Sequence, residues 1–215
     1  MRKITFFLFI LSLAIVSSCS STGSNSKNTA TKPAANADFK KGVAPVADPE
    51  IAVIEMENGS AYGTIKVELY SNIAPLQVAR FKELAKEGYY NGIAFHRINQ
   101  SVIQAGDSNT KPGATKTVGK EGDSGKPNVP AEFSDIPYDT GILGAARLGG
   151  DVNSANSQFF IMLKREAAFD KNYTVYGKVI DGMNNVRTIA QAPKVEGTER
   201  PVDAIRIKQI TIVPK

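Results

Sequence analysis

The clearest pattern along the chain is the alternation of apolar and charged residues across 62–70, which is typical of a half-buried β-strand. The apolar run Ile51–Met56 predicts a partner strand, and Asn58-Gly59 between the two is a hairpin turn signal. The last run, Ala204–Val213, also alternates until Gln209, where the phase slips by one residue and indicates a bulge. These segments predict strands that pair in a sheet.

One segment has the period of an amphipathic helix. Across 74–87, Pro75 stands near the start, apolar residues recur at a spacing of three, and Gly88 follows the end. A second helix is predicted over 183–191, and a Gly- and Pro-rich surface loop over 108–130. Five further strands are predicted at Ala94–Ile98, Val102–Ala105, Gly141–Ala145, Gln158–Met162 and Thr174–Val179. Many short strands with two helices predict a mainly β fold, a closed barrel with helices over its open ends.

Composition limits the chemistry that this fold can carry. The 215 residues include one His and one Cys, too few for zinc or iron–sulfur ligand sets, although carboxylates could still hold Ca²⁺ or Mg²⁺. The net charge of +5 falls to +3 if Arg2 and Lys3 are removed, which leaves 24 basic and 21 acidic residues. The basic residues are scattered and Trp is absent, which argues against nucleic-acid binding.

The N-terminus has the pattern of an export and lipidation signal. After Arg2-Lys3, the apolar run Ile4–Val16 has the length of a signal-peptide core and is shorter than the ~18 residues of a membrane span. The run ends in Val16-Ser17-Ser18-Cys19, which resembles a bacterial lipobox, and Cys19 is the only Cys. We predict a lipoprotein signal peptide over residues 1–18 and a lipid anchor on Cys19, with an ordinary secretory signal as the alternative.

The predicted anchor and the predicted fold are joined by a segment of low hydrophobicity. Residues 19–48 are rich in Ser, Thr, Asn, Ala and Lys, which predicts a flexible tether, and the folded domain is predicted over 49–215. The protein is therefore expected in the cell envelope, bound to a membrane through acylated Cys19. The outer membrane is favoured because no inner-membrane retention signal follows Cys19.

Five sequence blocks in the predicted domain carry a family resemblance. They are Phe95-His96-Arg97-Ile98, Gln104-Ala105-Gly106-Asp107, Gly141-Ile142-Leu143, Ser157-Gln158-Phe159-Phe160-Ile161 and Tyr176-Gly177-Lys178-Val179. In order and spacing they resemble the signature of the cyclophilins, and the likeness extends over 51–213. The resemblance implies an eight-stranded antiparallel β-barrel capped by two α-helices. It also implies peptidyl-prolyl cis–trans isomerase activity on proline-containing polypeptides, without a cofactor, and we expect a monomer.

The resemblance assigns the catalytic role to Arg97, whose guanidinium would contact the prolyl carbonyl and imide nitrogen, with Gln104 orienting it. The residues expected to bind substrate are Val102, Gln104, Ala146, Arg147, Gln158, Phe160, Phe169 and Tyr173. Rotation about an X-Pro bond makes and breaks no covalent bond, so the catalyst needs only a donor that favours the twisted amide. His96 neighbours Arg97 on the predicted strand and is expected to be structural, on the opposite face.

One segment departs from the family pattern. Between Arg97 and Gln104 the chain is one residue shorter than usual, and Ser101 and Val102 stand where the family has Phe and Met. Loss of apolar surface predicts a shallower proline pocket and weaker substrate binding. A second interpretation therefore stays open, in which the domain is a weakly active or inactive module that holds proline-containing loops.

Overall fold

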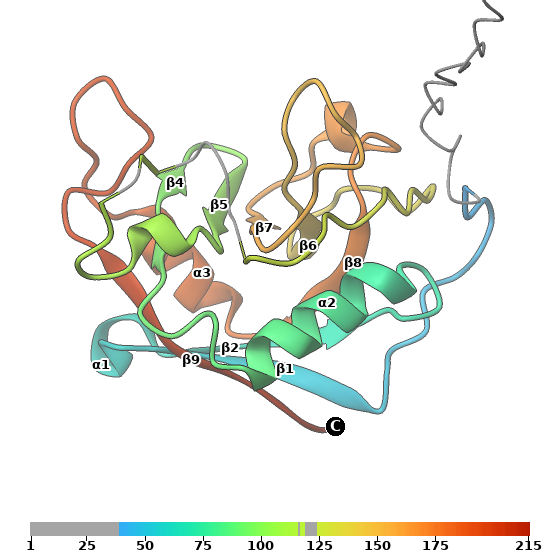
Figure 1. Cartoon of the computed structure of the whole chain (residues 1–215), viewed down its shortest axis with the longest axis horizontal. Helices are drawn as coiled ribbons and strands as arrows, with labels where there is room; N and C mark the ends of the chain where they lie inside the picture. The colour runs from blue at the N-terminus through green and yellow to red at the C-terminus, as the bar shows by residue number, and fades with distance from the viewer. Residues whose placement is uncertain (1–38, 116, 119–123) are drawn as a thin grey trace, which may run out of the picture. The chain divides into compact units, whose positions relative to one another are not determined.

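Nine strands form one antiparallel sheet in the computed structural model, which describes residues 39–115, 117–118 and 124–215. The strands are β1 (Glu50–Met56), β2 (Thr64–Leu69), β3 (Ala94–Phe95), β4 (Arg97–Ile98), β5 (Val102–Ala105), β6 (Ile142–Ala145), β7 (Phe159–Met162), β8 (Val175–Asp181) and β9 (Ile205–Pro214). The helices in the described residues are α1 (Gly59–Tyr62), α2 (Pro75–Lys86) and α3 (Met183–Ala190), with 3₁₀ turns at Ser108–Thr110 and Ala167–Phe169 (Figure 1).

The sheet curls into a barrel that is nearly closed. Its strand order is β3-β9-β1-β2-β8-β6-β7-β5-β4, so the two outermost strands are β3 and β4, which only His96 separates along the chain. The two ends of the sheet therefore meet at His96. The predicted antiparallel barrel is confirmed, but the count is nine strands, because the predicted strand Ala94–Ile98 breaks at His96. Its first half pairs with β9 and its second half pairs with β5.

The connection between β1 and β2 differs from the predicted two-residue turn. The Asn58 side chain accepts a hydrogen bond from the Ala61 backbone N–H, so Asn58 caps the one-turn helix α1 instead of forming the centre of a turn. Gly63 ends this helix with a positive φ of 61°. The two strands still pair as predicted, with Ile54 opposite Ile65. In β9 the register against β1 skips Lys208, which confirms the bulge one residue before Gln209.

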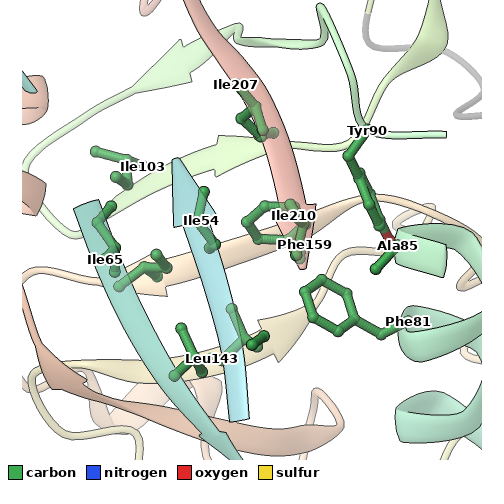
Figure 2. Close-up of a cluster of buried hydrophobic side chains, with 14 of the residues drawn as sticks. Ile54, Ile65, Phe81, Ala85, Tyr90, Ile103, Leu143, Phe159, Ile207 and Ile210 are labelled. Atoms are coloured by element: carbon green, nitrogen blue, oxygen red, sulfur yellow. The ribbon is translucent and has the colours of Figure 1, made fainter. Parts of the chain in front are cut away.

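The barrel interior and one face of α2 form the main core. On α2 the residues Val78, Phe81 and Leu84 are buried, as their spacing of three predicts. Phe81 meets Phe159 of β7 edge to face, with ring centroids 5.7 Å apart (Figure 2). α2 packs against β9, whereas α3 packs against β2 and β5. No helix among the described residues has the length and apolar character needed to span a bilayer.

Residues 39–48, which the sequence assigned to the tether, contact the barrel. The Lys40 backbone N–H donates to the Phe133 carbonyl (2.9 Å), and the Val46 backbone N–H donates to Asn72 Oδ1 (3.0 Å). Lys82 of α2 forms an ion pair with Asp48, with 2.7 Å between Nζ and Oδ2. The chain thus joins the fold some residues before Pro49. The predicted signal peptide and Cys19 lie outside the described residues.

Candidate active site

A single row of paired residues crosses four strands and places the predicted catalytic groups on one face. Arg97 of β4 lies opposite Gln104 of β5, Gln104 lies opposite Phe160 of β7, and Phe160 lies opposite Gly144 of β6. Directly paired residues project to the same side of a sheet. Val102, two residues before Gln104, shares that face because side chains alternate along a strand. The strand register therefore brings together residues that are distant in sequence.

These side chains line a pocket of about 270 Å³. Its lining residues are His96, Arg97, Val102, Gln104, Ala146, Arg147, Phe160, Phe169 and Tyr173. Eight of the nine residues predicted to act on the substrate are in this set. The ninth, Gln158, accepts a hydrogen bond from Nε2 of the lining residue Gln104 (2.8 Å).

The floor of the pocket is aromatic. The ring of Phe160 stacks on Tyr138 (centroids 5.8 Å apart) and meets the edges of Phe169 and Tyr173, each at 5.6 Å. Tyr138 is fully buried and lies in an irregular segment, where no periodicity marked it as part of the site. Gly144 makes room for this arrangement, because a Cβ there would lie 2.3 Å from Phe160 Cζ.

The shortened segment between Arg97 and Gln104 forms a tight turn. Asn99 Oδ1 accepts from the backbone N–H groups of Ser101 and Val102, both at 2.9 Å. The Ser101 hydroxyl donates to Glu166 Oε2 and is not part of the pocket lining. Val102 reaches the pocket at the position predicted for it. The Phe and Tyr side chains in the pocket lining are Phe160, Phe169 and Tyr173.

Arg97 is held from two sides. Its Nη1 donates to Gln104 Oε1 (3.3 Å), and its Nε donates to Glu199 Oε2 (2.5 Å). Burial tends to raise the pKa of Glu199, but hydrogen bonds from Arg97 and Asn99 outweigh it and bring this pKa below its usual value. The carboxylate is therefore charged at neutral pH. Sequence reasoning missed Glu199, which is 102 residues from Arg97 and outside the five blocks.

Arg147 belongs to the opposite wall and orders its surroundings. Its guanidinium lies over the ring of Tyr173, 4.7 Å from the centroid. Its Nε and Nη2 both donate to the Asn172 carbonyl, at 3.1 and 3.0 Å, and its Nη1 donates to the Leu148 carbonyl. These bonds fix the two loops that carry Arg147 and Tyr173.

The expectation for His96 is wrong in one respect. The strand breaks at this residue, so the alternation of faces does not apply, and His96 lines the same pocket as Arg97. Burial lowers the pKa of the His96 imidazole, which is therefore neutral at pH 7. A neutral imidazole at His96 leaves Arg97 with no repulsion from a cation at the preceding residue.

Known proteins share the sequence pattern and the fold of this chain. Residues 53–212 match the family model described as cyclophilin type peptidyl-prolyl cis-trans isomerase. The chain belongs to this family. It is 40% identical over 158 residues to a probable peptidyl-prolyl cis-trans isomerase of Brucella suis, an alignment that covers 71% of this cyclophilin and 78% of the relative. It is 36% identical to peptidyl-prolyl cis-trans isomerase-like 3 of Gallus gallus, over 70% of this chain and 90% of that one.

Solved structures show the same fold. This cyclophilin superposes with a TM-score of 0.65 and 27% identity on a cyclophilin type peptidyl-prolyl cis-trans isomerase of Cryptosporidium parvum, crystallised in the presence of the dipeptide ala-pro. The match covers 77% of this chain and 99% of the other. The cyclophilin AquaCyp293 of Hirschia baltica, at 19% identity and a TM-score of 0.61, shows the fold alone. The protein is thus an enzyme, a peptidyl-prolyl cis-trans isomerase.

Proposed function

We propose that this cyclophilin is a lipid-anchored isomerase of the cell envelope, which assists the folding of exported proteins with Arg97 as its catalytic group. The observation that supports the site is the row Arg97–Gln104–Phe160, in which a charged donor stands beside an aromatic floor. The support for the location is the pattern of the first 19 residues.

The chemistry follows from the nature of the X-Pro bond. Rotation must break amide resonance, a barrier of about 20 kcal/mol, and uncatalysed exchange takes tens of seconds. In the twisted amide the prolyl nitrogen becomes pyramidal and its lone pair localises, so it accepts a hydrogen bond better than the planar form does. A guanidinium beside that nitrogen therefore lowers the barrier. A reduction of about 7 kcal/mol accelerates rotation roughly 10⁵-fold.

Each wall of the pocket has a part in this step. The proline ring packs on Phe160 between Val102 and Phe169, which fixes one side of the rotating bond. Gln104 keeps the Nη1 side of Arg97 at the pocket through its 3.3 Å contact. The backbone beside Ala146 and the hydroxyl of Tyr173 supply polar contacts for the flanking chain. The site needs no cofactor for this reaction because no atom or electron is transferred.

Membrane attachment is tested by lipid incorporation. Cells that express the full chain are labelled with an alkyne-bearing palmitate analogue, together with Cys19→Ala and the matched control Ser20→Ala. We expect label and membrane association in the wild type and in Ser20→Ala, and neither in Cys19→Ala. Labelled Cys19→Ala, or unlabelled wild type that is exported, would reject the lipoprotein assignment.

Action on exported chains is tested by refolding. An exported protein whose refolding is limited by proline isomerisation is mixed with catalytic amounts of the mature chain, from residue 19 onward, or of its Arg97→Ala variant. We expect the wild type to accelerate the slow phase and Arg97→Ala to leave it unchanged. Equal protection from aggregation by both proteins, without acceleration by either, would favour the module that only holds proline-containing loops.

A further inference from the structure

The loop between α3 and β9 places the side chain of Glu199 beside Arg97. Lys194 and Pro201 form a bridge across its base, and the Val195 backbone N–H donates to the Arg200 carbonyl (2.9 Å). The Ile98 backbone N–H of β4 donates to the Glu199 carbonyl (2.7 Å), which brings the loop beside β4, as Figure 1 shows. β4 is the last strand of the sheet order, so the loop satisfies its outer edge and fixes the Glu199 backbone.

The Glu199 carboxylate joins two parts of the site. One oxygen accepts from Arg97 Nε (2.5 Å) and the other accepts from Asn99 Nδ2 (3.0 Å). Asn99 is itself held, because its Oδ1 caps the tight turn at Ser101 and Val102. The carboxylate therefore connects Arg97 to the turn that carries a pocket wall. Arg187 and Lys194 line a neighbouring groove together with Glu199, but the Glu199 carboxylate forms its hydrogen bonds with Arg97 and Asn99.

This contact occupies the Nε edge of the Arg97 guanidinium. A guanidinium has five N–H donors in a rigid fork. Glu199 takes the Nε edge and Gln104 takes one Nη1 donor, so within the described residues the remaining Nη donors are left for the substrate. An arginine side chain without such contacts samples many rotamers. A donor that must reach a transient prolyl nitrogen loses rate when its position varies, because misplacement by about 1 Å can cost up to ~10²-fold.

We propose that Glu199 is a positioning residue for the isomerisation, which holds Arg97 by its Nε edge and turns its Nη edge toward the proline pocket. This inference rests on the proposed role of Arg97. The ion pair is half-exposed, at 43% for Arg97 and 47% for Glu199, and pairs of this kind contribute little to stability. Removal of Glu199 should therefore change the rate far more than the folding.

The test combines kinetics with a direct signal from Arg97. Prolyl exchange in a short X-Pro peptide is measured by NMR for the mature chain in detergent, for Glu199→Ala and for Glu199→Gln. The exposed Glu196, on the same loop, gives the matched control Glu196→Ala. In the same samples the ¹⁵N-labelled arginine Nε resonances are recorded, and Arg97→Lys identifies the Arg97 signal by its absence.

We expect kcat to fall about tenfold in Glu199→Ala, with KM changed less than about twofold, because the interaction acts on the transition state. Glu199→Gln keeps an oxygen acceptor and should recover part of the rate, and Glu196→Ala should match the wild type. The Arg97 Nε–H proton should exchange with water at least about tenfold faster in Glu199→Ala, since its carboxylate partner is gone.

Two results would overturn the inference. If Arg97→Lys impairs the enzyme while Glu199→Ala retains the wild-type kcat, Glu199 does not position the donor. If Glu199→Ala is faster than the wild type, the carboxylate withholds Arg97 from the substrate. Absence of catalysis in the wild type would count against the proposed role of Arg97 instead, and the Nε–H exchange rate would still decide whether Glu199 holds the side chain.

Discussion

The substitution Gly144→Ala tests the pocket floor without replacing any residue that is predicted to bind the substrate. The added Cβ would lie 2.3 Å from Phe160 Cζ and 2.6 Å from Cε2, whereas an ordinary contact begins at 3.4 Å. The ring must therefore move by about 1.1 Å, the difference between the two distances. Tyr138 stacks on the Phe160 ring, and Phe169 and Tyr173 contact it edge to face. The free space into which the displaced ring can move is therefore the pocket.

The expected size of the effect follows from packing and contact area. Overpacking of a core costs about 1–3 kcal/mol, and in a domain of this size each kcal/mol lowers Tm by about 2–4 °C. If the displaced ring removes about 50 Å² of contact with the proline, binding weakens by about 1.3 kcal/mol at 25 cal/mol per Å². That corresponds to a roughly ninefold loss of kcat/KM, most of which should appear as an increase in KM.

The assay is NMR exchange spectroscopy over a range of X-Pro peptide concentrations, with thermal unfolding of the same samples. Gly150→Ala is the control, because a Cβ at that position has no atom within 4 Å. The double variant Gly144→Ala/Phe160→Leu should be more stable than the sum of the two single effects predicts, since the smaller side chain relieves the overlap. A folded Gly144→Ala with lowered Tm and unchanged kcat/KM would refute Phe160 as the floor.

Three further predictions concern the surroundings of the site. Asp48→Asn should cost about 1–3 kcal/mol at pH 7, because the Asp48 carboxylate accepts hydrogen bonds from Lys82 and Ser71. Burial tends to raise the pKa of Asp48, but these bonds outweigh it and bring the pKa below its usual value. The stabilisation is therefore present above the unfolded-state pKa and lost as the pH falls through the lowered folded-state pKa, so urea unfolding over a falling pH series should show the gap between wild type and variant shrinking, and equal stability at pH 7 would contradict this. Glu132→Ala should cost about 1–2 kcal/mol in the same assay, because this buried carboxylate accepts from the first N–H groups of α2, and an unchanged midpoint would exclude the capping role. Arg147→Ala should raise KM about two- to fivefold in the exchange assay with little change in kcat, as Tyr173 loses its cation–π contact, and an unchanged KM would contradict this.

The fold could be predicted where one local pattern decides the structure. The alternation across 62–70 and the spacing of three on α2 each reflect burial of a single face, and both elements formed as expected. The break at His96 could not be predicted, because its cause is closure of the barrel between β9 and β5 and no local signal marks it. Contacts of residues 39–48 with the barrel involve backbone groups and Asp48, which composition does not reveal.

In the candidate site, too, some residues could be predicted from the sequence and others could not. Resemblance to the cyclophilins led to the residues around the pocket, and the register Arg97–Gln104–Phe160 explains why they converge. Tyr138 and Glu199 were missed, since each lies in an irregular segment and acts through a neighbour that is distant in sequence. No sequence pattern identifies Glu199 as the partner of Arg97, because the contact depends on the path of the loop that carries Glu199.

The most direct test of the account is exchange of an X-Pro peptide by the mature chain, Arg97→Ala and Arg97→Lys, measured by NMR without a coupling protease. We predict rapid exchange with the wild type and a loss of about 10²–10³-fold in kcat with Arg97→Ala, the range for removal of a preorganised donor. Arg97→Lys should recover little, because an ammonium keeps the charge but not the fork. Exchange by Arg97→Ala within threefold of the wild type would contradict the account, as would a folded wild type that leaves the exchange rate unchanged.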